Sequence, residues 1–195
     1  MTTLPPISTL PSLDTEERAK VLDLLFEPCQ QLHTLSVSLL REKTFSSYDE
    51  LIDAVGKQLF DLYESNLESD TKWLDAILSA HPRLGEKKVD SEQSRNEQAQ
   101  LNQGGSEEAQ LLADMNRKYE ETFPGLRYVV FVNGRSRPVI MADMQKRIER
   151  GDISQEKQDA IKVGLDGNVS VALAVNDLKQ AMCAIASDRA SKLGG

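Results

Sequence analysis

Apolar residues recur at intervals of three and four along most of this chain, a spacing that places them on one face of an α-helix. The clearest run begins at Ser47 and Glu50, a capping-box pair, and extends to about Asn66. Its apolar stripe consists of Leu51, Ile52, Val55, Leu59 and Leu62. A second capping box, Asp14 with Glu17, predicts a helix that ends near Phe26. The pattern favours an all-α fold.

Further helices are predicted from the same periodicity and from the proline and glycine residues that interrupt it. They cover residues 32–40, 70–80, 91–101, 106–121, 138–150, 154–162 and 176–192. In the second of these, Trp73, Leu74, Ile77 and Leu78 are expected to point inward, and Ser154 is expected to cap the sixth. The helix over 106–121 has an apolar face made of Leu111, Leu112, Met115 and Tyr119. We therefore predict one multi-helix bundle over residues 1–195.

Three segments depart from the helical pattern. Residues 1–12 are rich in Pro, Ser and Thr and are expected to form an extended lead-in. Residues 128–132, YVVFV, have strand propensity but no partner strand, so they are predicted to be buried without being assigned to a sheet. Residues 163–175 contain glycine and β-branched residues and are read as a loop insertion.

Composition narrows the classes of function. The 195 residues have a net charge of −8, which disfavours a nucleic-acid partner or an anionic membrane surface. No apolar run is long enough to span a bilayer, and the N-terminus lacks the features of a signal peptide. The two cysteines suggest neither a disulfide framework nor a thiol-ligated metal. A cytoplasmic location is expected, or a peroxisomal one, because Ser191-Lys192-Leu193 resembles a peroxisomal signal although two glycines follow it.

His81 is the first candidate for chemistry. The chain has two histidines, and only a histidine or a perturbed carboxylate titrates near neutral pH. His33 lies inside a predicted helix, whereas His81 ends one and precedes Pro82, in a turn that can hold a side chain rigidly. The alternative is that His81 only bonds to carbonyl groups at the helix end.

A polar group follows this turn. Ser94, Glu97 and Gln98 stand at positions i, i+3 and i+4, which places them on one helical face where they can grip a small polar ligand. The alternative is that Ser94 and Glu97 form a capping box and only begin the helix, which leaves Gln98 without a role.

Other chemistries have weaker support. Glu86, Asp90 and Glu92 lie near His81 in sequence but lack the spacing of known metal-ligand motifs, so no metal site is predicted. Arg135, Arg137 and Arg189 are candidate anchors for a carboxylate or ureido group, although most arginines simply lie on solvated faces. The chain contains no phosphate-binding loop and no G-x-S-x-G motif.

Several short motifs, taken together and in order, resemble the family of 2-oxo-4-hydroxy-4-carboxy-5-ureidoimidazoline (OHCU) decarboxylases. The motifs are His81-Pro82-x-Leu84, Ser94-x-x-Glu97-Gln98, Tyr119 with Pro124-Gly125-Leu126, Phe131-Val132-x-Gly134-Arg135-Ser136, and Ile185-Ala186-x-x-Arg189. The resemblance extends from Leu10 to Leu193, and the order and spacing are more specific than any one motif.

The resemblance implies an all-helical enzyme that decarboxylates a small ureide to (S)-allantoin and carbon dioxide in urate catabolism, without a metal or organic cofactor. Members of this family often form homodimers, so a homodimer is a further expectation. His81 and Glu97 would be catalytic. The residues expected to hold the substrate are Pro82, Ser94, Gln98 and Arg189, with the backbone of Val129, Val130, Phe131 and Val132.

Two other functions compete with this interpretation. A non-catalytic helical interaction module would suit an acidic amphipathic bundle but would give His81 no role. A metal-dependent ureide hydrolase would require bound zinc or manganese.

Overall fold

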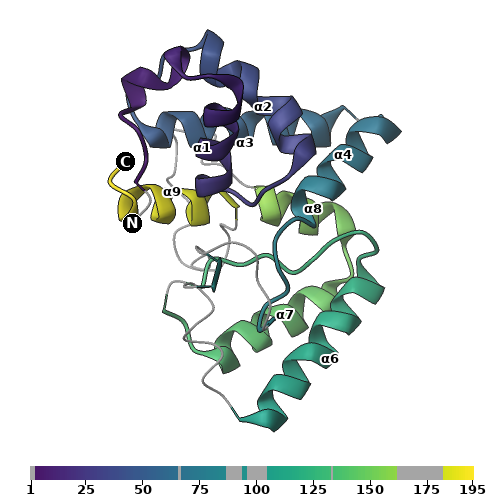
Figure 1. The fold of residues 1–195 in the computed structure, drawn as a ribbon. Helices are drawn as coiled ribbons and strands as arrows, with labels where there is room; N and C mark the ends of the chain where they lie inside the picture. Colours follow the sequence, from purple (N-terminus) through teal and green to yellow (C-terminus); the bar gives the residue numbers. More distant parts are fainter. Residues whose placement is uncertain (1–2, 66, 87–93, 96–104, 133, 162–181) are drawn as a thin grey trace, which may run out of the picture.

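A computed structural model describes residues 3–65, 67–86, 94–95, 105–132, 134–161 and 182–195, and these residues fold into an all-α structure (Figure 1). The helices are η1 (Ile7–Ser12), α1 (Thr15–Leu25), α2 (Gln30–Glu42), α3 (Tyr48–Glu64), α4 (Glu68–Leu78), α6 (Ser106–Thr122), α7 (Arg137–Arg150), α8 (Ile153–Ile161) and α9 (Met182–Lys192). No strand occurs in these ranges. The predicted fold class is confirmed.

The helices form two groups, and α8 leads from one to the other. α1 to α4 pack on one another, and α9 lies along α3 and α1 (Figure 1). At the opposite end of the molecule, α6 and α7 pack side by side. α8 follows α7 and contacts α3 and α9, so it returns the chain to the first group. The two ends of the chain meet there, where Leu4 N–H donates to the Leu193 carbonyl at 3.2 Å.

The predicted helix starts and stops are largely correct. The Asp14 side chain accepts from Glu17 N–H, and Glu17 returns a bond to Asp14 N–H, so both halves of the capping box form. Ser47 caps α3, although the Glu50 carboxylate accepts from Ser46 rather than Ser47. Gly151 ends α7 with a φ of 63°, a conformation in which glycine has no Cβ clash.

Four local predictions were wrong. Residues 7–12 form a 3₁₀ helix instead of extended chain, because Thr9 N–H and Leu13 N–H close turns onto Pro6 and Leu10. Asp152, not Ser154, caps α8, with Gln155 N–H as donor at 3.0 Å. Ser154 instead bonds to Tyr63.

Trp73 and Leu111 are exposed, contrary to expectation. Each directly precedes a buried leucine, and a helix turns by about 100° per residue, so each lies to the side of that leucine; at these two positions that side faces solvent.

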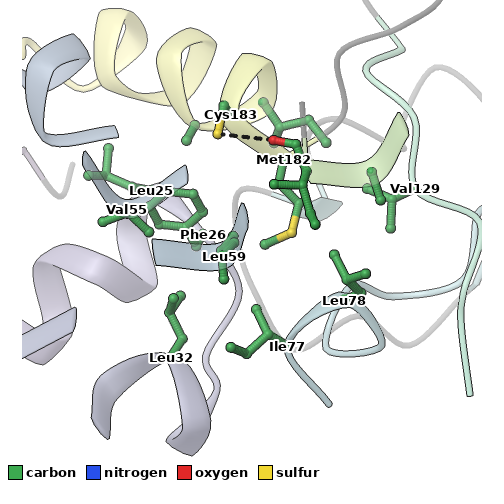
Figure 2. Close-up of a cluster of buried hydrophobic side chains, with 14 of the residues drawn as sticks. Leu25, Phe26, Leu32, Val55, Leu59, Ile77, Leu78, Val129, Met182 and Cys183 are labelled. Atoms are coloured by element: carbon green, nitrogen blue, oxygen red, sulfur yellow. Dashed lines mark hydrogen bonds between the residues drawn. The ribbon is translucent and has the colours of Figure 1, made fainter. Parts of the chain in front are cut away.

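The core joins the first helix group to α9 and to the segment before α7. Figure 2 shows Leu25 and Phe26 from the end of α1, Leu78 from α4, and Met182 from the start of α9 in one cluster. Val129 lies at the edge of this cluster, and the dashed line marks Cys183 Sγ donating to the Ile161 carbonyl at 3.6 Å. The cluster therefore fixes the places where α1 and α4 end and α9 begins.

Several predictions concern residues outside the described ranges. They include most of the helix over 91–101, the loop over 163–175 and the start of the last helix, 176–181. Ser94 and Arg95 are helical, and Tyr128, Val129 and Val130 are buried without forming a strand. In the described ranges no helix is both long and apolar enough to cross a membrane.

Candidate active site

The carboxyl end of α1 is where the site begins. Pro28 follows Glu27 and disfavours helical backbone at that residue, and α1 has already ended at Leu25. Arg189, on α9, points its guanidinium at this end, and Nη1 donates to the carbonyls of Phe26 at 2.9 Å and Leu25 at 3.5 Å. A cation at the C-terminus of a helix interacts favourably with the helix dipole.

Arg189 also pairs with Glu27, the residue that follows the end of α1. Nη2 of Arg189 lies 2.7 Å from Glu27 Oε1, and both side chains are almost fully buried. Ser94 Oγ donates to the same carboxylate oxygen and accepts from Arg189 Nη2 at 3.0 Å. We call Glu27, Ser94 and Arg189 the site triad. These three residues are far apart in sequence, and the fold brings them into direct contact.

His81 lies in a turn that three anchors fix. Arg127 Nη1 donates to the His81 carbonyl at 2.9 Å, and Asn116 Nδ2 on α6 donates to the Leu84 carbonyl at 2.9 Å. Arg83 forms a bidentate ion pair with Glu120 on α6, at 2.5 and 2.8 Å. The turn is therefore held to α6 and to the segment that follows it.

The His81 ring is buried, with 5 % of the residue exposed, and its Nε2 has no hydrogen-bond partner among the described residues. Burial lowers the pKa of His81 to about 4, because the imidazolium loses its hydration. The negative charge of Glu27 opposes this shift, whereas the positive charges of Arg189 and Arg127 add to it. At neutral pH the ring is uncharged, so one nitrogen can accept a proton and the other can donate one.

A second buried cluster supports the segment over 128–132. Arg147 on α7 pairs with Asp143 at 2.9 Å and with Glu156 on α8 at 2.9 Å. Tyr119 donates to Glu156 and Tyr128 donates to Asp143, each at 2.5 Å. Arg147, Asp143, Glu156, Tyr119 and Tyr128 form what we call the scaffold cluster. Arg147 Nη1 also reaches the Val129 carbonyl, at 3.5 Å, which ties this segment to α7.

The structure brings some of the predicted site residues together. Ser94 and Arg189 contact Glu27, and His81 is buried within electrostatic range of Glu27 and Arg189, while Pro82 beside His81 is half-buried. Glu97 and Gln98 lie outside the described residues. Val129 and Val130 are buried, and Phe131 and Val132 are half-buried.

Sequence reasoning missed Glu27 and Arg127. A usable signal for Glu27 was its position directly before Pro28. The proline marks the end of an amphipathic helix, and an acidic residue at that break is not explained by the apolar pattern. Arg127 acts through the backbone carbonyl of His81, and no side-chain pattern encodes such a contact.

The remaining candidate residues have other partners. His33 Nε2 lies 2.6 Å from Asp23 Oδ1 on α1, away from the triad. Arg135 donates to the carbonyls of Phe131 and Val132, and Arg137 contacts Glu108 at 3.4 Å. Among the residues that the structure describes, no three of His, Cys, Asp and Glu are grouped as metal ligands would be. Asp90 and Glu92 lie outside this set.

Comparison with known protein families bears directly on this geometry. Residues 11–163 match the family described as OHCU decarboxylase, which is more than half of the chain. The chain belongs to the OHCU decarboxylase family. A comparison with curated proteins gave no match. The OHCU decarboxylases are carboxy-lyases that act on a small ureide of urate catabolism, so the chain is an enzyme of that class. Arg189 lies beyond the matched residues, yet it contacts Glu27 and Ser94, which lie within them.

Proposed function

We propose that this chain converts OHCU to (S)-allantoin and carbon dioxide, with no metal or organic cofactor, and that His81 and Glu97 are its catalytic residues. Family membership supports the reaction class. The observation that carries the assignment of His81 is its buried, uncharged ring, whose Nε2 has no partner among the described residues and which lies within electrostatic range of the site triad. A buried polar atom that the protein leaves unsatisfied is costly, and such atoms are common where a ligand supplies the missing bond.

The chemistry needs an acceptor for the electron pair left when the C–C bond to the carboxylate breaks. The conjugated C=N bond of the substrate can take up this pair, so no pyridoxal or thiamine is needed. In our proposal, His81 and Glu97 remove the proton of the substrate hydroxyl and deliver a proton to the ene-type intermediate. Arg189 and Gln98 fix the face of the ring that receives this proton, and this choice makes the product one enantiomer.

Substrate binding in this proposal draws on Pro82, Ser94 and the backbone of residues 129–132. Arg189 and Arg127 are positive and Glu27 is negative, so the three described charges near the neutral His81 sum to +1. This sign suits a substrate that carries a carboxylate. Hydrogen bonds from Arg135 and Arg147 to carbonyls of the 129–132 segment support a backbone held in one conformation.

The test generates OHCU in situ from urate with the upstream enzymes and follows the circular dichroism of the allantoin formed, with and without this protein. We expect rapid formation of one enantiomer, unaffected by a chelator. Slow formation of racemic allantoin at the rate of the blank would refute the proposal and favour a non-catalytic helical module. Loss of activity with chelator would favour a metal-dependent ureide hydrolase.

We also propose that the enzyme is a homodimer and acts in the cytoplasm or in peroxisomes. The family resemblance supports the homodimer, and Ser191-Lys192-Leu193 supports the peroxisome. Light scattering of the purified protein tests the first point, and imaging of the protein with its native C-terminus free tests the second.

A further inference from the structure

Glu27 has a position that the proposed chemistry does not yet use. It is a carboxylate with 5 % of its surface exposed, in the connection between α1 and α2. A buried charge is costly unless it is paired and hydrogen-bonded, and Glu27 meets this condition through Arg189 and Ser94. The fold therefore keeps this charge in contact with Ser94 and Arg189, the two residues that we propose bind or orient the substrate.

We propose that Glu27 is a positioning residue that fixes the Arg189 guanidinium and the Ser94 hydroxyl beside His81 in the geometry that turnover requires. The inference rests on the proposed function for its kinetic consequences but not for its structural ones.

The directions of the hydrogen bonds support this role. One oxygen, Glu27 Oε1, accepts from both Ser94 Oγ and Arg189 Nη2, so a single atom sets the position of both side chains. Nη1 of Arg189 is held by the carbonyls of Phe26 and Leu25. The planar guanidinium is therefore held at both terminal nitrogens, and Glu27 supplies the carboxylate in these contacts of Arg189.

The charge of Glu27 gives it a second effect, on His81. Three charged groups of the described residues act on the His81 ring, from three parts of the chain: Glu27 after α1, Arg189 on α9, and Arg127 before the 128–132 segment. Glu27 is the negative one and favours the protonated ring. Of these three charges, the two that remain after removal of the Glu27 charge are both positive.

The chain offers a matched pair of acids for the test. Glu27→Gln keeps the size and the acceptor oxygen but removes the charge, and Glu27→Ala removes both. Asp23→Asn is the control, because Asp23 is also an acidic residue of α1, but it lies 2.6 Å from His33. The chain has only two histidines, so their ring resonances can be told apart. A different acidic residue acts on each ring, Glu27 on His81 and Asp23 on His33.

The first readout is the pH titration of the His81 ring resonance by NMR. In wild type we expect the His81 signal to titrate with a midpoint of about 4. Glu27→Gln should lower this midpoint, whereas Asp23→Asn should leave it unchanged. An unchanged His81 titration in Glu27→Gln would overturn the inference, whether or not the protein is an OHCU decarboxylase.

The second readout is kinetic, with OHCU generated in situ and with thermal melts to verify the folded fraction. We expect Glu27→Ala to lose about 100-fold in kcat, the cost of displacing reacting groups by about an ångström. Glu27→Gln should lose less, and its KM should not rise, because the site becomes more positive toward an anionic substrate. Wild-type kcat and a single enantiomer in Glu27→Ala would overturn the inference while the proposed function stands. No turnover by wild type would refute the proposed function, and the titration would still test Glu27.

Discussion

Two buried clusters of arginine and carboxylate, the scaffold cluster and the site triad, can be compared within the described residues, and they differ in what lies unsatisfied beside them. In the scaffold cluster Arg147 faces two carboxylates, and two tyrosine hydroxyls donate to those same carboxylates. The guanidinium of Arg147 also lies over the Tyr128 ring, 5.0 Å from its centre. In the site triad Arg189 and Glu27 are paired as well, but the neighbouring His81 has a buried nitrogen with no bond among the described residues.

Under the proposed function, this difference separates a cluster that stabilises the fold from one that takes part in the reaction. Partners on every side of a buried ion pair compensate its desolvation, as in the scaffold cluster. An imidazole held neutral and unsatisfied costs stability, and proteins accept such costs mainly at functional sites. Substitutions in the two clusters should therefore have opposite effects on stability and on turnover.

The largest expected effect is on turnover, in His81→Leu. Removal of the imidazole should reduce kcat by about 10²–10⁴-fold, the usual contribution of a general acid or base. The melting temperature should stay the same or rise, because an apolar side chain of similar size leaves no unsatisfied nitrogen. Turnover of in situ OHCU and a thermal melt measure the two quantities. A large fall in the melting temperature, with kcat retained, would make His81 a structural residue and erase the contrast.

Glu156→Leu should show the reverse pattern. It leaves Arg147 and Arg150 short of a buried partner, because both arginines pair with Glu156. Breaking a buried pair from one side typically costs about 3–5 kcal/mol, which we expect in the free energy of unfolding by urea. Measured well below the melting temperature, kcat should fall by less than about ten-fold, the equivalent of 1.4 kcal/mol. A larger loss of kcat than of stability would place the scaffold cluster in the site.

The third prediction concerns the pH dependence of stability, which the titration of His81 next to the site triad should produce. The folded pKa of His81, about 4, is below the ordinary value of about 6.5. The unfolded chain therefore binds the proton first as the pH falls. The effect of His81 on the free energy of unfolding is therefore constant above about pH 6.5. Between about pH 6.5 and 4 the free energy of unfolding falls progressively, by up to about 3 kcal/mol. Urea melts of wild type and His81→Leu across this range measure it, since the variant lacks that part of the loss. Parallel stability curves for the two proteins would contradict the assigned shift.

The two clusters also differ in how far sequence could predict them. Helix positions followed from periodicity and capping, as at Asp14 and Gly151, because these signals are local. His81, Ser94 and Arg189 were predicted as site residues from their motif order, and in the structure Ser94 and Arg189 are in direct contact. Glu27 was missed because its partners are 67 and 162 residues away, and only packing determines such contacts. The scaffold cluster was missed for the same reason: charged residues on α7 and α8 look like a solvated surface until the tyrosines cover them.

The smallest effect expected is at the contact between Arg127 and the His81 backbone. Arg127→Met removes one hydrogen bond to a carbonyl, which typically costs about 1 kcal/mol, so kcat should fall by about five-fold as the turn loosens. Arg117→Met is the matched control, because Arg117 pairs with Asp114 on the surface of α6.

The direction of the change in the His81 pKa makes this variant decisive, although its effect on kcat is small. Arg127 lowers the pKa of His81, so Arg127→Met should raise the midpoint of the His81 resonance, opposite to the change expected for Glu27→Gln. Opposite shifts of one ring signal cannot arise from general loosening of the fold, which would move both variants the same way, toward the unperturbed value. Equal shifts in the two variants would therefore show that neither charge acts on His81 directly, and the site would then differ from the scaffold cluster only in its burial.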